Sequence, residues 1–169
     1  MQPKRPQDSL NIMSELVLPN DTNTLGNLMG GRLMHWMDIS AAISAMKHCN
    51  NPVVTASVDN VSFSKPIQLG NLLTIESKVT RAFNTSMEIF IRVWGEDLKS
   101  QVRYLSNEAY LTFVSLDADG KPQPVPGIVP ETEEEKKNFE EALRRRQLRL
   151  ILSGKMKLKD ANELQVLFR

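Results

Sequence analysis

The chain contains very few residues of the kinds that form disulfides and transition-metal sites. Among its 169 residues, Cys49 is the only cysteine, and His35 and His48 are the only histidines. A single cysteine excludes an internal disulfide and any metal site built on paired cysteines. Two histidines exclude a histidine-rich zinc site. We therefore expect no bound metal.

The chain also lacks strong charge of one sign and long hydrophobic runs. Its 21 basic and 20 acidic residues give a formal net charge of +1, which offers no bulk attraction to nucleic acid or to a membrane. No run is apolar for long enough to cross a bilayer. The N-terminus, MQPKRPQDSLN, has no apolar core like that of a signal peptide. We expect a cytoplasmic protein without nucleic-acid or membrane partners.

The chain is long enough for one domain. Along it, the hydrophobic pattern changes from that of a helix to that of strands. Residues 27–48 have helix length and apolar residues all round, which is typical of a buried helix. Alternating or β-branched segments predict strands at 9–18, 53–63, 72–83, 86–96 and 102–117, the last long enough to be bent or bulged. The strands after the helix follow one another too closely for parallel crossovers. We therefore predict an α+β fold, an antiparallel sheet around one long helix.

The two ends of the chain differ from this central region. Residues 1–8 are polar and expected to be flexible, and the main domain is expected at 9–127. The extension at 128–169 is expected to hold a charged helix at 132–152, opened by a capping box, and a short helix at 160–168. The acids of the longer helix come first and its arginines last, as the helix dipole favours. Its charges indicate a solvated face or, alternatively, contacts with a neighbouring subunit or an anionic ligand.

One acid stands out in the predicted buried helix. The stretch DTNTLGNLMGGRLMHWMD, residues 21–38, passes through a Gly-Gly pair and ends on Asp38, whose helix face carries mostly small residues. Burying a lone carboxylate without a basic neighbour is costly. Burial also favours the protonated form of a carboxylate, which is one way in which proteins prepare a general base. Two interpretations stay open: a catalytic group, or a carboxylate that hydrogen-bonds near a surface edge.

The residues before Asp38 also have two interpretations each. Gly30 and Gly31 fall in the first helical turn, where N–H groups can hold an anion or a developing oxyanion. Small residues there equally allow close contact between helix and sheet. Asn23 fits an ordinary Asx turn, and His35 is typical of a structural position.

Several stretches together resemble the hotdog-fold acyl-CoA thioesterases, specifically the cytosolic brain-type and bacterial YciA-like branch. That branch has a D-x-N-x-x-G-x-x-x-G-G stretch followed at fixed spacing by M-[DE]. The matching residues are Asp21, Asn23, Gly26, Gly30, Gly31, Met37 and Asp38. The resemblance continues through VVTASVDNVSFSKPIQLGN, TSMEIFIRVW and AYLTFVSLDADGKPQPVP, and it covers roughly residues 10–127.

The resemblance implies a single hotdog fold and a pair of subunits with active sites at their seam, commonly assembled as a trimer of dimers. It implies that Asp38 acts as general base or nucleophile in hydrolysing an acyl-CoA thioester to free fatty acid and coenzyme A. Asn23 would act with it from the facing subunit, and the Gly31 N–H would polarise the carbonyl. Thr55 is expected to line the site, with ordinary strand packing as the alternative. Coenzyme A would be part of the substrate, so no separate cofactor is expected.

The phosphates of coenzyme A imply basic residues near the mouth of such a site. The candidates for binding coenzyme A or the acyl group are Gly30, Thr55, Lys65, Arg81 and Arg103. Relatives often carry an arginine where this chain has Asn84, in the stretch FNTSME. Either Arg81 takes the place of that arginine, or coenzyme A binds more weakly.

Two other functions stay open at this stage. A hydroxyacyl dehydratase of the same fold generally needs a catalytic histidine, and neither histidine lies in such a motif. A non-catalytic acyl-CoA-binding or regulatory protein could keep the fold, but the presence of both Asn23 and Asp38 argues against it. The sequence does not indicate the acyl chain length.

Overall fold

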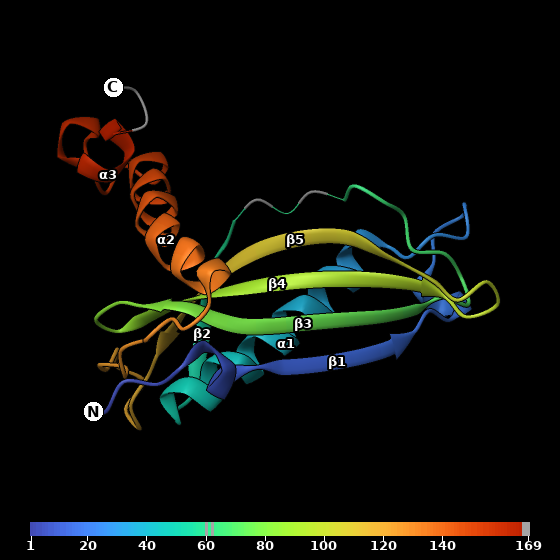
Figure 1. The fold of residues 1–169 in the computed structure, drawn as a ribbon, viewed down its shortest axis with the longest axis horizontal. Helices are drawn as coiled ribbons and strands as arrows, with labels where there is room; N and C mark the ends of the chain where they lie inside the picture. Colours follow the sequence, from blue (N-terminus) through green and yellow to red (C-terminus); the bar gives the residue numbers. More distant parts are fainter. Residues whose placement is uncertain (60, 62, 167–169) are drawn as a thin grey trace.

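The structure, a computed structural model, describes residues 1–59, 61 and 63–166, and its centre is a five-stranded sheet (Figure 1). Every pair of neighbouring strands is antiparallel, in the order β1-β3-β4-β5-β2. The elements are β1 (Asn11–Leu16), α1 (Gly30–Cys49), β2 (Val53–Asp59), β3 (Leu72–Ala82), β4 (Ser86–Asp97), β5 (Val102–Ser115), α2 (Glu133–Leu152) and α3 (Asn162–Gln165). The predicted antiparallel sheet with one long central helix is confirmed.

Helix α1 lies along one face of the sheet, which we call the inner face (Figure 1). The side of the helix that meets the sheet is buried and includes Leu33, Met37, Ala41 and Ala45. These residues pack with apolar side chains from β3, β4 and β5 into one core. The burial of this apolar surface is the main source of stability for the fold.

The opposite side of α1 is also apolar, but the single chain leaves it partly uncovered. Met34 is 40% exposed and Met46 is 41% exposed. On the edge strand β2, Val54 and Val58 are 47% and 43% exposed. A helix on one face of a single sheet can bury only one side, so the apolar residues all round α1 indicate that a second surface covers the other side.

Helix α2 packs against the opposite face, which we call the outer face, through ion pairs. Lys78 of β3 pairs with Glu135, and Glu88 of β4 pairs with Arg145. Arg149 reaches Asp59 of β2 and Thr112 of β5. The interpretation of these arginines as part of a solvated face is therefore wrong for Arg145 and Arg149, while contacts outside the chain stay a prediction. The sequence could not show that these charges meet carboxylates of their own sheet.

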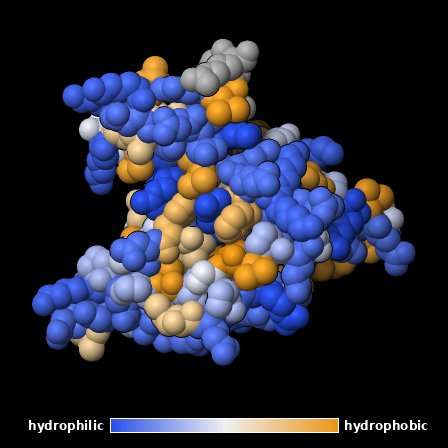
Figure 2. Space-filling view, turned by 60° about the vertical axis from the view of Figure 1, so that its left-hand side comes forward, coloured by the Kyte–Doolittle hydropathy of each residue, from blue (hydrophilic) through white to orange (hydrophobic). Residues whose placement is uncertain are grey.

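The far end of α2 and α3 project from the body of the molecule (Figure 1). Apolar side chains gather in the hollow between this projection and the rest of the chain (Figure 2). Leu148 is 46% exposed and Leu152 is 79% exposed. The predicted capping box of α2 is confirmed, because Thr132 accepts from the Glu135 N–H and Glu135 accepts from the Thr132 N–H.

Some boundaries differ from the sequence expectations. The strand expected at 53–63 ends at Asp59, and positions 60 and 62 lie outside the described residues. Helix α1 begins at Gly30 rather than at residue 27, after an extended segment at Met29. The helix expected at 160–168 is a short 3₁₀ turn followed by α3, and positions 167–169 lie outside the described residues.

The N-terminal segment makes more contacts than its composition suggests. The backbone of Lys4 pairs with the stretch at Gly127–Val129, and Pro6 and Ser9 are buried. The Ser9 hydroxyl accepts from the Val79 N–H of β3. This segment therefore links the start of the domain to the proline-rich connection that follows β5.

A buried histidine ties the end of α1 to the same connection and predicts a pH dependence of stability. The His48 side chain is fully buried, and its Nε2 lies 2.7 Å from the Pro126 carbonyl oxygen. Burial lowers the pKa of His48 below the ordinary histidine value of 6.5. The unfolded chain therefore binds a proton that the folded chain does not, and stability falls as the pH drops below 6.5.

We expect the free energy of unfolding to decrease by at most about 1.4 kcal/mol per pH unit from this one group as the solution is acidified. Denaturant unfolding between pH 7 and pH 5 measures it. A His48→Gln variant keeps a hydrogen-bonding side chain without the titration, so its slope over this range should be smaller. Equal slopes for the two proteins would contradict the assignment.

Candidate active site

Asp38 lies on the side of α1 that faces strand β2, beside an apolar cavity. The Thr55 hydroxyl of β2 donates a 2.7 Å hydrogen bond to Asp38 Oδ1. The adjoining cavity has a volume of about 260 Å³. Its lining residues are Gly31, Met34, His35, Met37, Asp38, Val58, Val61 and Leu111. A half-buried carboxylate with one oriented oxygen thus borders a space suited to an apolar chain.

A β-bulge in β2 places Thr55 and Val58 on the same side of the sheet. Thr55 is opposite Phe113 of β5 and Ser57 is opposite Thr112, which leaves Ala56 as the extra residue. In a regular strand, residues 55 and 58 would point to opposite faces. The extra residue removes this alternation, so Thr55 reaches Asp38 while Val58 lines the same cavity.

The contact between Thr55 and Asp38 gives a first prediction for the site. A Thr55→Val variant keeps the shape of the side chain but cannot donate to Asp38, so the carboxylate loses one constraint on its orientation. We expect turnover to fall by up to about tenfold, which corresponds to a hydrogen bond to a charged group. Stability should change little because Thr55 is exposed. A Thr55→Ser variant, which retains the hydroxyl, should keep most of the activity; equal losses in both would contradict the role.

Asn23 lies in the loop before α1, which a buried acid holds in place. Asp21 accepts from the Leu18 N–H and pairs with Arg32 Nε at 2.9 Å. The Asn23 Oδ1 accepts from the backbone N–H groups of Leu25 and Asn27, as the predicted Asx turn requires. These bonds leave the side-chain NH₂ directed away from its own loop and without a partner among the described residues. It can therefore donate to a ligand or to another subunit.

Asn23 borders a different cavity from the one beside Asp38. This second cavity has a volume of about 270 Å³. Its lining residues are Asn23, Asn27, Leu28, Gly30, Leu33, Phe63, Lys65, Pro66, Ile67 and Ser106. Within one chain, Asn23 and Asp38 therefore do not meet in a common cavity.

The N-terminus of α1 separates these two cavities. Gly30 lines the cavity of Asn23 and Gly31 lines the cavity of Asp38. No side chain caps this helix end, so its first N–H groups are available to a ligand. The Phe63 ring lies over Gly30, where an added Cβ would come within 3.2 Å of it. A helix start with free N–H groups suits the stabilisation of an oxyanion, and here it shares a cavity with the carboxylate of Asp38.

A larger cavity lies elsewhere, between the β4–β5 turn and the segment at 65–71. It has a volume of about 460 Å³ and contains neither Asp38 nor Asn23. We base the site on the two smaller cavities because the carboxylate, the asparagine and the start of α1 border them.

The three basic candidates are placed very differently. Lys65 borders the cavity of Asn23 and the large cavity. Arg81 instead lies under α2, where it donates to the Phe139 carbonyl and stacks on the Phe139 ring. Burial lowers the pKa of Arg81. Arg103 lies on the outer face, paired with Glu76 at 3.0 Å and stacked on Trp94.

The structure thus brings Asn23, Gly30, Gly31, Asp38, Thr55 and Lys65 to the two cavities, and places Arg81 and Arg103 away from them. Sequence reasoning missed Phe63 and Ser106, which line the cavity of Asn23. The sequence carries no sign of this, because it predicts Phe63 at the end of one strand and Ser106 within another. Among the described residues, no group of three His, Cys, Asp or Glu side chains is arranged to hold a metal, and no helix is long and apolar enough to span a membrane.

Comparison of the sequence with known proteins gives consistent matches. Residues 25–101 match the family model described as Thioesterase superfamily. The chain is 46% identical over 129 residues to the uncharacterized acyl-CoA thioester hydrolase YkhA of Bacillus subtilis, covering 76% of this chain and 75% of that one. It is 43% identical over 142 residues to the cytosolic acyl coenzyme A thioester hydrolase of Mus musculus. That match covers 83% of this chain but only 37% of the mouse protein, so the chain spans well under half of its length.

Solved structures give the same picture. A hexameric acyl-CoA thioesterase without ligand superposes with a TM-score of 0.88 at 42% identity, covering 90% of this chain and 98% of that chain. An acyl-CoA hydrolase from Staphylococcus aureus superposes with a TM-score of 0.84 at 39% identity, covering 91% and 96% of the two chains. Another structure of the Staphylococcus aureus hydrolase holds butyryl coenzyme A and coenzyme A.

The Staphylococcus aureus structures include variants in which an asparagine, an aspartate or a threonine is replaced by alanine. The aspartate comes fifteen positions after the asparagine, and the threonine comes seventeen positions after the aspartate. Asn23, Asp38 and Thr55 are the same residue types with the same two spacings. Asn23, Asp38 and Thr55 of this chain therefore match, in type and spacing, the three residues replaced there.

Proposed function

This chain belongs to the thioesterase superfamily, and we propose that its catalytic pair consists of Asp38 from one subunit and Asn23 from the subunit facing it. The chain is an acyl-CoA thioester hydrolase, which converts an acyl-CoA and water to a free fatty acid and coenzyme A. The assignment of Asp38 rests on its position. Thr55 orients its carboxylate, and the apolar cavity beside it also borders Gly31 at the uncapped start of α1.

The proposed chemistry follows from these neighbours. Asp38 accepts a proton as a water oxygen attacks the thioester carbonyl carbon. The carbonyl oxygen gains negative charge and accepts a hydrogen bond from the Gly31 N–H at the start of α1. The helix dipole there also favours an anion. The carbon–sulfur bond then breaks, and the proton passes to the departing thiolate of coenzyme A. Asn23 orients the water or the carbonyl through its free NH₂ group.

Asp38 has a second route to the same products. Its carboxylate can attack the carbonyl carbon directly, release coenzyme A and leave an anhydride that water hydrolyses. A single turnover in ¹⁸O-labelled water detects the second route. Direct attack by water puts the label in the fatty acid and leaves the protein unlabelled. When Asp38 attacks and water then opens the anhydride at the Asp38 carbon, the product keeps an unlabelled carboxylate oxygen and the label appears in the protein.

The involvement of two subunits rests on the gap between the two residues. Asn23 and Asp38 border separate cavities within one chain, so one chain alone does not assemble the pair. The uncovered side of α1 and the free edge of β2 carry the exposed apolar side chains of Met34, Met46, Val54 and Val58. A second copy packed on this surface would cover them and bring its Asn23 toward Asp38. By analogy with the hexameric relative, we propose a trimer of such dimers.

The substrate would enter where Lys65 can meet a coenzyme A phosphate. Lys65 borders the cavity of Asn23 and is exposed, and a flexible ammonium group suits a phosphate. We propose that Arg81 and Arg103 take no part in this, because their guanidinium groups are committed to Phe139 and Glu76. A cytoplasmic location is proposed from the cytosolic relative.

The direct test is release of free thiol from a series of acyl-CoAs of increasing chain length. Turnover on one part of the series supports the function and gives the chain-length preference. A parallel assay for hydration of an enoyl-CoA should give no product. If no acyl-CoA in the series releases thiol, the proposed hydrolytic function is overturned. Tight binding of acyl-CoA in that case would indicate a binding protein.

A further inference from the structure

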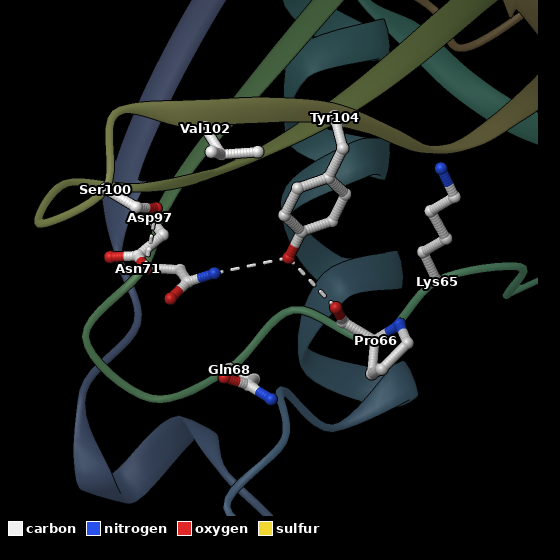
Figure 3. A pocket seen from close by; sticks show the side chains of 8 residues that line it. All are labelled: Lys65, Pro66, Gln68, Asn71, Asp97, Ser100, Val102 and Tyr104. Carbon is white, nitrogen blue, oxygen red and sulfur yellow. Dashed lines mark hydrogen bonds between the residues drawn. The ribbon is translucent and has the colours of Figure 1, made fainter.

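Strand β5 sends two polar side chains to the segment at 63–68, which borders the cavity of Asn23. The Tyr104 hydroxyl donates to the Pro66 carbonyl oxygen at 2.9 Å and accepts from Asn71 Nδ2 at 3.2 Å (Figure 3). The Ser106 hydroxyl donates to the Lys65 carbonyl oxygen at 2.8 Å. Two consecutive carbonyl groups of the segment are therefore held by two residues of one strand.

A β-bulge makes this pairing geometrically possible. Val93 of β4 is opposite Asn107, and Trp94 is opposite Leu105, so Ser106 is an extra residue in β5. On the C-terminal side of this bulge, β5 alternates regularly. Its inward-facing residues there are buried: Asn107, Ala109, Leu111 and Phe113. Regular alternation would turn residues 104 and 106 to the outer face. The extra residue turns both of them inward, toward the segment at 63–68.

A glycine on the neighbouring strand leaves room for the tyrosine ring. Gly95 of β4 is opposite Tyr104. A Cβ added at Gly95 would lie 2.6 Å from the Cζ atom of the Tyr104 ring. The ring therefore lies across Gly95, and no larger residue fits there without moving it. The bulge and the glycine are two independent features that serve the same placement of Tyr104.

The segment that is held in this way forms one wall of the proposed substrate site. Its Phe63 ring covers Gly30 at the start of α1, and Lys65 and Pro66 line the cavity with Asn23. The hydrogen bonds from β5 reach the backbone of the segment rather than its side chains, so they fix its path. Loss of them would free this wall, and Lys65 with it, without replacing Asp38 or Asn23.

We infer that Tyr104 and Ser106 are positioning residues that clasp the segment at 63–68 over the start of α1 and so shape the coenzyme A side of the site. This inference rests on the proposed function. It assigns to a bulge that does not line the cavity of Asp38 a role in substrate affinity rather than in the chemical step.

The two tyrosines of the chain provide a matched test. Tyr104→Phe removes the hydroxyl that holds Pro66. Tyr110→Phe removes a hydroxyl from the same strand that bonds Asn138 on the outer face, 3.1 Å away. We expect Tyr104→Phe to raise KM for acyl-CoA by about threefold to tenfold, the equivalent of a net hydrogen bond, with kcat within about twofold. Tyr110→Phe should leave KM unchanged.

Amide hydrogen exchange gives a readout that a general loss of stability would not imitate. The amides of residues 63–65, 67 and 68 should exchange faster in Tyr104→Phe than in Tyr110→Phe, while the amides of α1 exchange equally in both. Gly95→Ala, which displaces the Tyr104 ring from the β4 side, should give the same pattern, and Ser106→Ala should add to it.

The outcomes separate the clasp from the proposed function. If the unmodified protein hydrolyses acyl-CoA and Tyr104→Phe has the same KM, the clasp alone is overturned. This holds whether or not amide hydrogen exchange at 63–68 increases. An increased KM without faster exchange would also overturn it, because the segment would not have been released. Absence of turnover by the unmodified protein would overturn the proposed function and the role of the clasp in substrate binding.

Discussion

Replacing Asp38 with asparagine is expected to lower kcat by about 10²–10⁴-fold, the usual contribution of a general base. The amide has nearly the same shape and its oxygen can still accept the hydrogen bond from Thr55. It can neither take a proton from water nor attack the thioester. The loss should therefore appear in kcat, measured by thiol release, while the melting temperature and the oligomeric state stay close to those of the unmodified protein. Retention of most of the activity would exclude Asp38 as base and as nucleophile.

Mixing two inactive variants tests whether the site is shared between subunits. An Asn23→Ala subunit keeps Asp38, and an Asp38→Asn subunit keeps Asn23, so a mixed dimer contains one intact site. Random reassembly of equal amounts should restore about a quarter of normal activity, because half of the dimers are mixed and each has one working site of two. Each variant reassembled alone serves as the control. No recovery in an assembled mixture would place both residues in the same subunit.

Replacing Arg145 with methionine is expected to destabilise the fold by about 3–5 kcal/mol, since it leaves a carboxylate buried without its partner. Glu88 is 1% exposed, and Arg145 binds both of its oxygens, at 3.0 Å and 2.8 Å. The Thr80 hydroxyl also donates to Glu88. Burial lowers the pKa of Arg145, but the hydrogen bonds and charge of Glu88 outweigh this and hold the pKa above its ordinary value. Denaturant unfolding at neutral pH measures the loss.

Two further variants show whether the unpaired charge causes the effect. Lys136→Met removes a partner from the exposed pair with Glu133 on the same helix, and it should change stability by less than about 1 kcal/mol. In the double variant Glu88→Gln with Arg145→Met, no charge remains buried, so a large part of the lost stability should return. If the double variant is as unstable as Arg145→Met alone, packing of the arginine over Tyr110 is the main contribution instead.

The sequence by itself predicted the elements of this protein, and its resemblance to a family named the candidate residues in and before α1. The alternating segments became strands of an antiparallel sheet, and the capping box opened α2 as expected. The motif from Asp21 to Asp38 identified Asn23, Gly30, Gly31 and Asp38 before any contact was known. The elements could be predicted because hydrophobic period, caps and turns are local properties, encoded within a few consecutive residues. The site candidates came from the resemblance instead.

Only the tertiary structure decided which face the side chains of three strands point to. Extra residues at Ala56, Thr80 and Ser106 interrupt the alternation in β2, β3 and β5. Two of these bulges explain why the basic candidates Arg81 and Arg103 lie away from the site. Continued alternation from Val79 and from Asn107, which are both buried on the inner face, would have turned the two arginines inward.

Two of these bulges also form parts of the site that regular alternation would not have produced. At Ala56 the bulge lets Thr55 reach Asp38 while Val58 lines its cavity, and at Ser106 it lets two side chains hold the segment at 63–68. A bulge depends on the pairing of two strands that are distant in the chain, so no single strand's sequence records it. The sequence therefore determined which residues were available for catalysis, and the pairing of the strands decided which of them meet.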